Sequence, residues 1–182
     1  DATLEHLYEV NYPKKVSAKD VNLLTVSDKA PGFVKEVTAM MMAGHGDNIP
    51  VSKMTVDGTY PSGTTQWEKR NISDLVPVWE PDVCIQCGNC AYVCPHSVIR
   101  AKFYHKDYLK NSPDDFKSAP INARGFPETQ YSLQVYLEDC TGCNLCVEVC
   151  PATDPSNRSK KAINMGEKEP ILQKEQKNID FF

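Results

Sequence analysis

Apolar residues are spread unevenly along this chain of 182 residues, and their spacing predicts a few short elements. Near the start, Leu4, Leu7 and Tyr8 recur at i, i+3 and i+4, which is the spacing of one face of a helix. Residues 1–12 are therefore expected to hold the end of a helix.

A second helix is expected from Pro31 to Gly44. Proline suits an early helical position, Phe33 and Val37 recur at helical spacing, and glycine is typical just after a helix end. Residues 46–77 contain many turn residues and too few periodic apolar positions for a core of their own. We expect this segment to lie extended across a larger body.

Four apolar runs predict strands in the second half of the chain. Residues 76–79 and 133–137 each come just before a group of cysteines, and residues 98–103 and 162–165 each follow one after a short expected helix. The order strand, helix, strand thus occurs twice. It predicts an α+β fold in which a βαβ unit is repeated with pseudo-two-fold symmetry.

These elements suggest four parts along the chain. Residues 1–30 are read as an end helix and linker, and residues 31–77 as a helix and a wrapping segment. Residues 78–170 form the predicted compact domain, with a polar insertion at 104–130 that carries three prolines. The tail, 171–182, ends on apolar residues and is expected to lead to a following domain.

Eight cysteines form two runs with the same spacing. They are Cys84, Cys87, Cys90, Cys94, Cys140, Cys143, Cys146 and Cys150. Each run reads C-x2-C-x2-C-x3-C-P, and each member of the second run lies 56 positions after its counterpart. This run is the bacterial ferredoxin signature for [4Fe–4S] clusters, so the predicted fold is a two-cluster bacterial ferredoxin-like domain.

The spacing has a physical reason. Two-residue gaps let a looped backbone bring three sulfurs onto one cube, with the N–H groups of the loop directed at the anionic centre. Gly88 and Gly142 leave room for close approach of the backbone. The second loop has Gly142 before its second cysteine and Asn144 after it, the reverse of Gln86 and Gly88 in the first loop.

The fourth cysteine of each run follows on a helical turn that carries it away from its own loop. In two-cluster ferredoxins it binds the other cluster. We therefore expect two crossed ligand sets: Cys84, Cys87, Cys90 and Cys150 for cluster 1, and Cys140, Cys143, Cys146 and Cys94 for cluster 2. Four ligands per cluster leave no open iron position, so the predicted chemistry is single-electron relay, and no catalytic residue is expected.

Disulfides and zinc are the alternative uses of these cysteines. A disulfide scaffold is typical of secreted chains, and no secretory signal is recognisable here, so a cytoplasmic protein is expected. Zinc ribbons use two separated CxxC pairs, whereas three cysteines within seven residues crowd one side of a tetrahedron. Both alternatives are less favourable than iron–sulfur clusters.

The charge balance bears on the partners. Lys and Arg number 20 against 24 Asp and Glu, giving a formal net charge of −4, which offers no reason to expect nucleic acid. No apolar run approaches the roughly 18 residues of a membrane span, so no membrane is expected. Arg158, Lys160 and Lys161 form a basic patch, which is either a solvated loop or a docking point for an acidic electron carrier.

Motifs outside the cysteines add a family resemblance. The stretches at 49–52, 57–64, 67–70 and 76–79, together with the residues around Cys94, resemble the pyruvate:ferredoxin (flavodoxin) oxidoreductase family. The similar region is that family's domain with two [4Fe–4S] clusters and the linker before it.

The resemblance implies a piece of an enzyme that converts pyruvate and CoA to acetyl-CoA and CO2. It implies ferredoxin or flavodoxin as the electron acceptor and the remaining domains of the parent enzyme as partners. Thiamine diphosphate, Mg and a third [4Fe–4S] cluster are expected elsewhere in that parent, which is expected to be a homodimer. A relay domain of another 2-oxoacid oxidoreductase or redox complex is the alternative.

Overall fold

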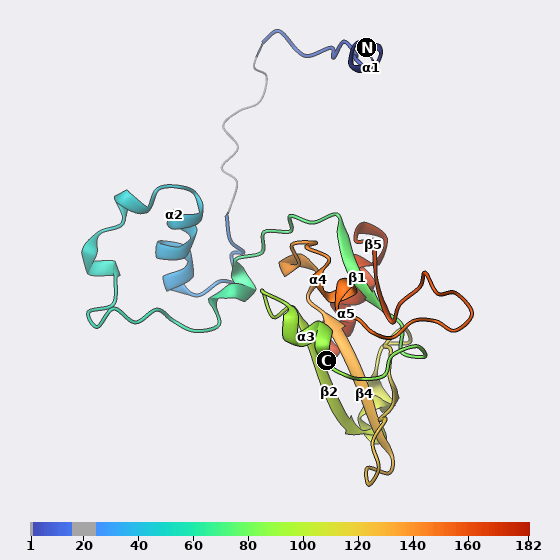
Figure 1. Ribbon diagram of the computed structural model, residues 1–182. Helices are drawn as coiled ribbons and strands as arrows, with labels where there is room; N and C mark the ends of the chain where they lie inside the picture. The colour runs from blue at the N-terminus through green and yellow to red at the C-terminus, as the bar shows by residue number, and fades with distance from the viewer. Residues whose placement is uncertain (1, 16–24) are drawn as a thin grey trace. The chain divides into compact units, whose positions relative to one another are not determined.

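The computed structural model describes residues 2–15 and 25–182 (Figure 1). It divides into two units, Asp1–Glu68 and Lys69–Phe182, which are described separately. Part of the linker expected within residues 1–30 lies outside the described residues.

The first helix of the first unit is shorter than the spacing predicts. Helix α1 spans Ala2–Glu5, and the chain leaves the helical path before Leu7 and Tyr8, which are 69% and 80% exposed. A helix of this length is costly to nucleate and depends on a buried face. Since Leu4 is also exposed, nothing in the described chain stabilises a longer helix here.

The second predicted helix is present. Residues Val34–Thr38 form the π-helical segment η1, which continues directly into α2 at Ala39–Met42. Gly44 follows with a φ of +75°, a backbone conformation that glycine adopts easily and that ends the helix. Gly44 therefore marks the end of the helix as the sequence predicts, while η1 begins at Val34, three residues after Pro31.

Tyr60 fixes the turn-rich segment to this helix. Its ring packs edge-on against Phe33 with 5.1 Å between centroids, and its hydroxyl lies 2.6 Å from Thr38 Oγ1. The segment also contains three short 3-10 turns: η2 (Gly46–Asn48), η3 (Val51–Lys53) and η4 (Thr64–Trp67).

The second unit contains two small antiparallel sheets, and every predicted strand contributes to one of them (Figure 1). In the first sheet, β1 (Leu75–Trp79) pairs with β5 (Ile163–Glu167). In the second, β4 (Thr129–Val135) lies between β2 (Ile99–His105) and the two-residue strand β3 (Ala119–Pro120). The second unit thus has the expected α+β character.

Short helices connect and cover these strands. They are α3 (Asn89–Val93), η5 (Lys106–Asn111), η6 (Leu137–Asp139), α4 (Leu145–Glu148), η7 (Glu169–Ile171) and α5 (Leu172–Phe181). Helix α3 contacts both β2 and α4, while α4 also contacts β5. These contacts hold the segments that follow the two cysteine loops next to each other.

The core of the second unit lies between the sheets and the cysteine loops. Val76 on β1 and Ile163 on β5 have 0% and 1% of their surface exposed, and Leu133 on β4 is buried with them. Cys140 and Cys146 belong to the same buried cluster. The cysteine loops are therefore positioned by the main core rather than by surface contacts.

The inserted segment is an ordered part of the second unit. Strand β2 continues to His105 and β4 begins at Thr129, so the segment between these two strands is 106–128. Within it, β3 extends the sheet, and Lys117 Nζ donates a hydrogen bond to the carbonyl O of Trp79 at 2.6 Å. The insertion thus contacts both sheets.

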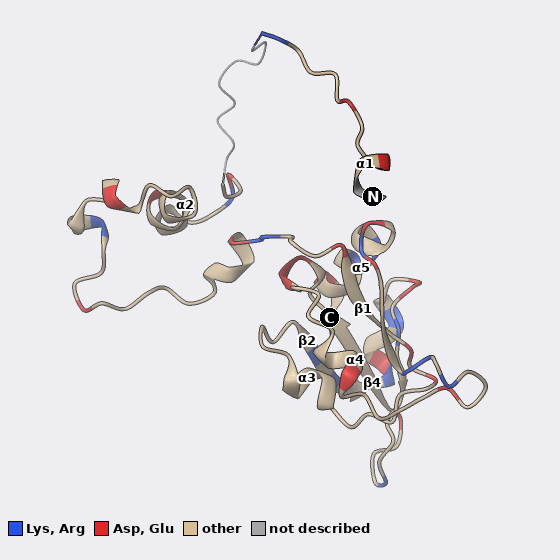
Figure 2. Ribbon diagram, turned by 45° about the horizontal axis from the view of Figure 1, so that its top comes forward, with Lys and Arg blue, Asp and Glu red and all other residues tan. Residues whose placement is uncertain are grey.

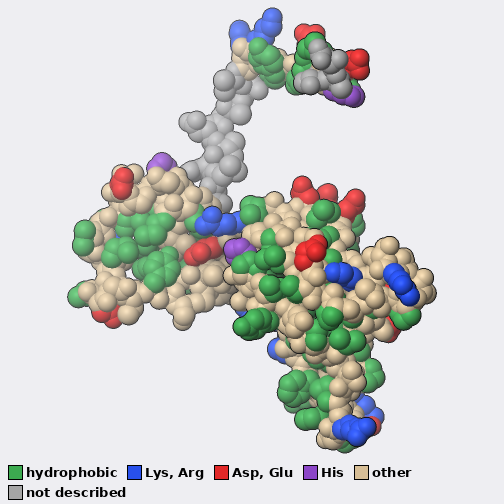
Figure 3. All heavy atoms as spheres, viewed as in Figure 1, with side chains coloured by type: hydrophobic (Ala, Val, Ile, Leu, Met, Phe, Trp, Pro, Cys, Tyr) green, Lys and Arg blue, Asp and Glu red, His purple; other side chains and the backbone are tan. Residues whose placement is uncertain are grey.

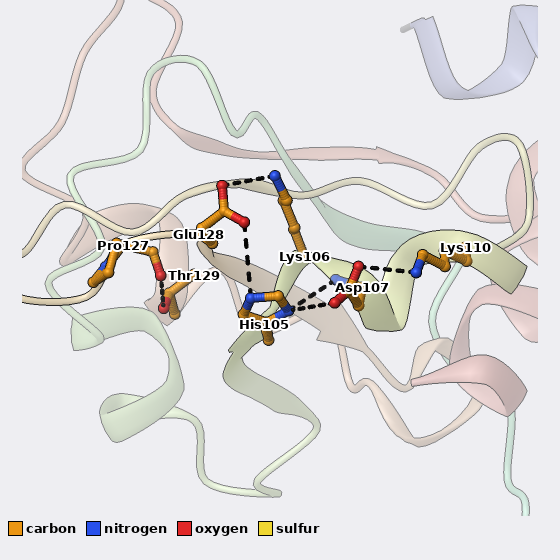
Figure 4. A network of polar contacts seen from close by, with 7 residues as sticks. All are labelled: His105, Lys106, Asp107, Lys110, Pro127, Glu128 and Thr129. Carbon is orange, nitrogen blue, oxygen red and sulfur yellow. Dashed lines mark hydrogen bonds and ion pairs between the residues drawn. The ribbon is translucent and has the colours of Figure 1, made fainter.

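A polar network closes the neck of this insertion (Figure 4). Lys106 donates to Glu128 twice, from its backbone N–H to the carbonyl O at 2.8 Å and from Nζ to Oε1 at 2.7 Å. His105 Nδ1 lies 3.1 Å from Asp107 Oδ2. The other carboxylate oxygen of Asp107 forms an ion pair with Lys110. Hydrogen bonding to Glu128 raises the pKa of Lys106. Because these side chains are exposed, each ion pair contributes little to stability.

The C-terminal tail packs on the second unit. Helix α5 contacts β4, and the rings of Phe181 and Phe182 lie against Phe116 with centroids 4.8 and 6.4 Å apart. Lys102 Nζ stands 4.3 Å from the centroid of the Phe182 ring. The apolar end of the chain therefore has a packing partner within this unit.

Candidate metal centre

The two cysteine loops have the same backbone form. Gln86 and Gly88 in the first loop have φ values of 59° and 76°, and Gly142 and Asn144 in the second have 68° and 66°. The first loop leads into α3 and the second into α4. Matching left-handed positions show that the repeat in the sequence is also a repeat in the backbone.

This backbone form directs an amide at a sulfur in each loop. The N–H of Gln86 donates to Cys84 Sγ at 3.3 Å, and the N–H of Gly142 donates to Cys140 Sγ at 3.4 Å. Successive amides in such a turn make an anion-binding concavity. Both loops are therefore suited to hold sulfur as thiolate.

Two cavities lie against these loops, with volumes of about 340 and 330 Å³ when their open mouths are included. Each is lined by four cysteines, three from one run and the last from the other. The first cavity has Cys140, Cys143, Cys146 and Cys94, and the second has Cys84, Cys87, Cys90 and Cys150. The structure thus brings together the same sets of four that the sequence predicts.

The donor set and surroundings suit an iron–sulfur cube. The non-cysteine walls are mostly apolar, including Met165 and Ile99 in the first cavity and Tyr131 and Ile163 in the second. All eight cysteines are free. Within residues 2–15 and 25–182, no three His, Cys, Asp or Glu side chains converge on the position of a single metal ion. The four soft sulfur ligands instead surround a space larger than one ion.

Burial keeps several of these thiols protonated when no metal is bound. It raises the pKa of Cys90 to about 12 and that of Cys146 to about 11, and it also raises the pKa of Cys140. Backbone N–H groups from Ala91 and Val147 act against burial at Cys90 and Cys146 respectively. Since thiolates are the metal ligands, metal binding must release these protons.

We predict a fixed order of thiol alkylation in the metal-free chain at pH 7. The exposed Cys87 and Cys143 should react with iodoacetamide first, and Cys90 and Cys146 last, at least about tenfold more slowly because desolvation raises the pKa of both thiols and keeps them protonated. Mass spectrometry of peptides after timed quenching measures the order. In urea the difference should vanish, and equal rates in the folded chain would contradict the burial described here.

The expected basic patch is partly engaged in structural contacts. Lys161 Nζ donates to the carbonyl oxygens of Val147 and Glu148 at 2.7 and 3.2 Å, at the end of α4. Lys160 Nζ lies 3.5 Å from Glu80 Oε1. Basic residues in this unit stand among acidic ones along the ribbon (Figure 2). Lys161 thus contacts the end of α4, and Lys160 pairs with the residue that follows β1.

A second set of contacts at this loop was not apparent from the sequence. Lys69 Nζ lies 2.5 Å from Asp139 Oδ2, and the N–H of Asn71 donates to the carbonyl O of Glu138 at 3.1 Å. Lys168 Nζ in turn donates to the carbonyl O of Asn71 at 3.3 Å. In the sequence, the motif at 67–70 indicates a family resemblance but not this contact, because no local pattern shows which residues lie beside Cys140.

Large apolar side chains are exposed on the surface of this unit (Figure 3). Among them, Tyr92 on α3 is 95% exposed, and Ile85 and Leu145 belong to segments that carry cysteines.

No helix in the described parts of the chain has the length and apolar character needed to cross a membrane.

Comparison with known families agrees with the geometry. Residues 83–153 match the family described as a 4Fe-4S double cluster binding domain, and residues 20–73 match a domain of unknown function named EKR. The two cysteine loops that line the cavities lie within the stretch that is similar to the double-cluster family. Its eight cysteines are the number needed for two [4Fe–4S] clusters.

The chain is also similar to one stretch of several longer curated proteins. Over the full length of this chain, it is 45% identical to the pyruvate-flavodoxin oxidoreductase of Nostoc sp. and 37% identical to the pyruvate:ferredoxin oxidoreductase of Moorella thermoacetica. Over 86% of the chain, it is 52% identical to the Escherichia coli protein named "Probable pyruvate-flavodoxin oxidoreductase". The chain spans 16%, 15% and 13% of these relatives respectively. It is therefore homologous to one stretch of the pyruvate-flavodoxin oxidoreductases.

Proposed function

We propose that this chain is the electron-relay part of a pyruvate:ferredoxin (flavodoxin) oxidoreductase. In the parent enzyme it would pass single electrons from a thiamine diphosphate site to ferredoxin or flavodoxin. The observation that carries this proposal is the pair of cavities, each lined by four cysteines drawn from both runs. The parent's other cofactors (Mg and a third cluster), its remaining domains and its homodimeric state belong to the same proposal.

Two crossed ligand sets follow from the cavities. In our proposal Cys84, Cys87, Cys90 and Cys150 hold cluster 1, and Cys140, Cys143, Cys146 and Cys94 hold cluster 2. When bound, each cluster supplies a one-electron redox centre. The chain's own residues exclude water with apolar walls and direct the N–H groups of Gln86 and Gly142 at sulfur. Because each set has four protein ligands, the proposed chemistry is electron transfer rather than bond making.

Strand pairing supports a pseudo-two-fold arrangement of the two βαβ units. The first βαβ unit is β1, α3 and β2, and the second βαβ unit is β4, α4 and β5. Strand β1 pairs with β5, and β2 pairs with β4, so each sheet takes one strand from each unit. The strands are exchanged between the units in the same way as the fourth cysteines. We propose that the two clusters are related by this exchange.

The division of the chain by role is also a proposal. Residues 31–77 would wrap the parent enzyme after the linker in 1–30, residues 78–170 would carry the clusters, and 171–182 would lead to a following domain. The fixed contacts of α5 support a tail held on this unit before any continuation.

Metal analysis of anaerobically purified chain tests the function. We expect about eight irons and a matching amount of sulfide per chain, with broad visible absorption that dithionite bleaches. A colourless chain containing zinc would overturn the proposal and favour a zinc-stabilised interaction module.

A further inference from the structure

The two cysteine loops carry different residue types at one matching left-handed position, which is Gln86 in the first loop. The matching position in the second loop is Gly142, for which this conformation is easy, whereas a side chain makes it unfavourable. Glycine is needed at 142 because a Cβ there would lie 2.2 Å from Ser73 Oγ. The first loop instead keeps a glutamine in the less favourable conformation.

The side chain of Gln86 binds the outer edge of β3. Its Nε2 donates to the carbonyl O of Pro120 at 2.8 Å, and its Oε1 accepts from the N–H of Asn122 at 2.7 Å. The N–H of Ile121 donates to the carbonyl O of Thr129 on β4. Because backbone groups alternate between the two edges of a strand, the carbonyl O of Pro120 and the N–H of Asn122 face the edge away from β4. The carboxamide therefore pairs with β3 as a neighbouring peptide group would.

Strand β3 is itself firmly held. Lys117, just before it, donates from Nζ to Trp79 O and accepts at its carbonyl O from Ser132 Oγ at 2.8 Å. Phe116 packs against Phe181 of α5. Gln86 thus connects the first cysteine loop to a segment anchored on both the core and the C-terminal helix.

We propose that Gln86 is a positioning residue that clamps the first cysteine loop to the insertion. The clamp holds the left-handed backbone at residue 86, which keeps its N–H directed at Cys84 Sγ at 3.3 Å. This inference rests on the proposed function, since it concerns the cluster beside Cys84. An N–H donor at a ligating sulfur stabilises the more negative reduced cluster, so loss of the clamp lowers that cluster's midpoint potential.

Two variants separate the clamp from backbone strain. Gln86→Gly relieves the strain and removes both hydrogen bonds, whereas Gln86→Met keeps the length and the strain but also removes both bonds. We expect about tenfold faster hydrogen exchange at Asn122 in both variants, measured by mass spectrometry on the full iron-loaded chain. Redox titration followed by electron paramagnetic resonance should show one cluster at a lower midpoint potential in Gln86→Met. In Gln86→Gly both clusters should keep their wild-type potentials, because glycine adopts the left-handed backbone without a clamp, as Gly142 does.

Asn144→Gly is the matched control. Asn144 has the same left-handed conformation in the second loop, but its side chain donates to Glu148 at the end of the helix that follows it. This variant should leave exchange at Asn122 and the potential of the first cluster as in the wild type. Wild-type exchange at Asn122 in either Gln86 variant, or a wild-type potential in Gln86→Met, would overturn the clamp. The iron content of the wild-type chain tests the proposed function separately.

Discussion

Replacing Cys94 by alanine is expected to remove the cluster beside Cys140, Cys143 and Cys146 and to leave the other cluster in place. Cys94 lines the cavity of the second run, although in the sequence it belongs to the first. Loss of one ligand exposes an iron and destabilises the cube. The iron content should therefore fall from about eight to about four per chain.

The measurement combines iron and sulfide analysis with the alkylation pattern of the remaining cysteines. Cys140 and Cys143 should become reactive in Cys94→Ala, while Cys84 and Cys87 stay protected by their cluster. Cys150→Ala is the mirror control, with the opposite pattern. If Cys94→Ala instead exposed Cys84 and Cys87, each cluster would be held by a single run and the crossed assignment would be wrong.

Replacing Gly142 by alanine is expected to be the most destabilising glycine substitution in the two loops. Its φ of +68° disfavours any side chain, and the new Cβ would lie 2.2 Å from Ser73 Oγ and 3.3 Å from the carbonyl O of Leu75. Ser73 Oγ already donates to Leu75 O at 2.5 Å, so moving it aside breaks that bond. We expect a loss of about 2–4 kcal/mol in the free energy of unfolding.

Gly88→Ala is the control for Gly142→Ala. Gly88 has a similar φ of +76°, but no atom lies within 4 Å of the added Cβ, so only the backbone cost of about 1 kcal/mol applies. Anaerobic urea unfolding, followed by visible absorption and circular dichroism, should place the midpoint of Gly142→Ala about 1–2 M below the wild type. Equal midpoints for the two variants would show that the approach of Ser73 does not constrain the loop.

The sequence predicted the strands because they depend on local pattern. The apolar run at 76–79 is β1, and the spacing of the cysteines fixes which sulfurs share a loop. The helix ending at Gly44 was predicted for the same reason. The spacing of Leu4, Leu7 and Tyr8 misled, because an apolar stripe forms a helix only where something covers it.

What the sequence could not indicate depends on contacts between distant segments. The contact of Lys69 with Asp139 joins residues 70 positions apart, and that of Gln86 with Pro120 joins residues 34 apart. The sequence shows that glycine and the polar residue stand in reverse order in the two loops, but it does not show why. Only the structure shows that Ser73 approaches one loop while β3 approaches the other.

The pairing of β1 with β5 has a consequence for biosynthesis. Leu75 on β1 lies opposite Glu167 on β5. Strand β1 therefore cannot pair until nearly the whole second unit has been synthesised. Pairing across so long a stretch of chain is slow, and exposed strand edges invite aggregation in the meantime. Each cysteine pocket likewise stays incomplete until the second run has been translated. Delivery of iron to a nascent chain would therefore come late and for both pockets almost together.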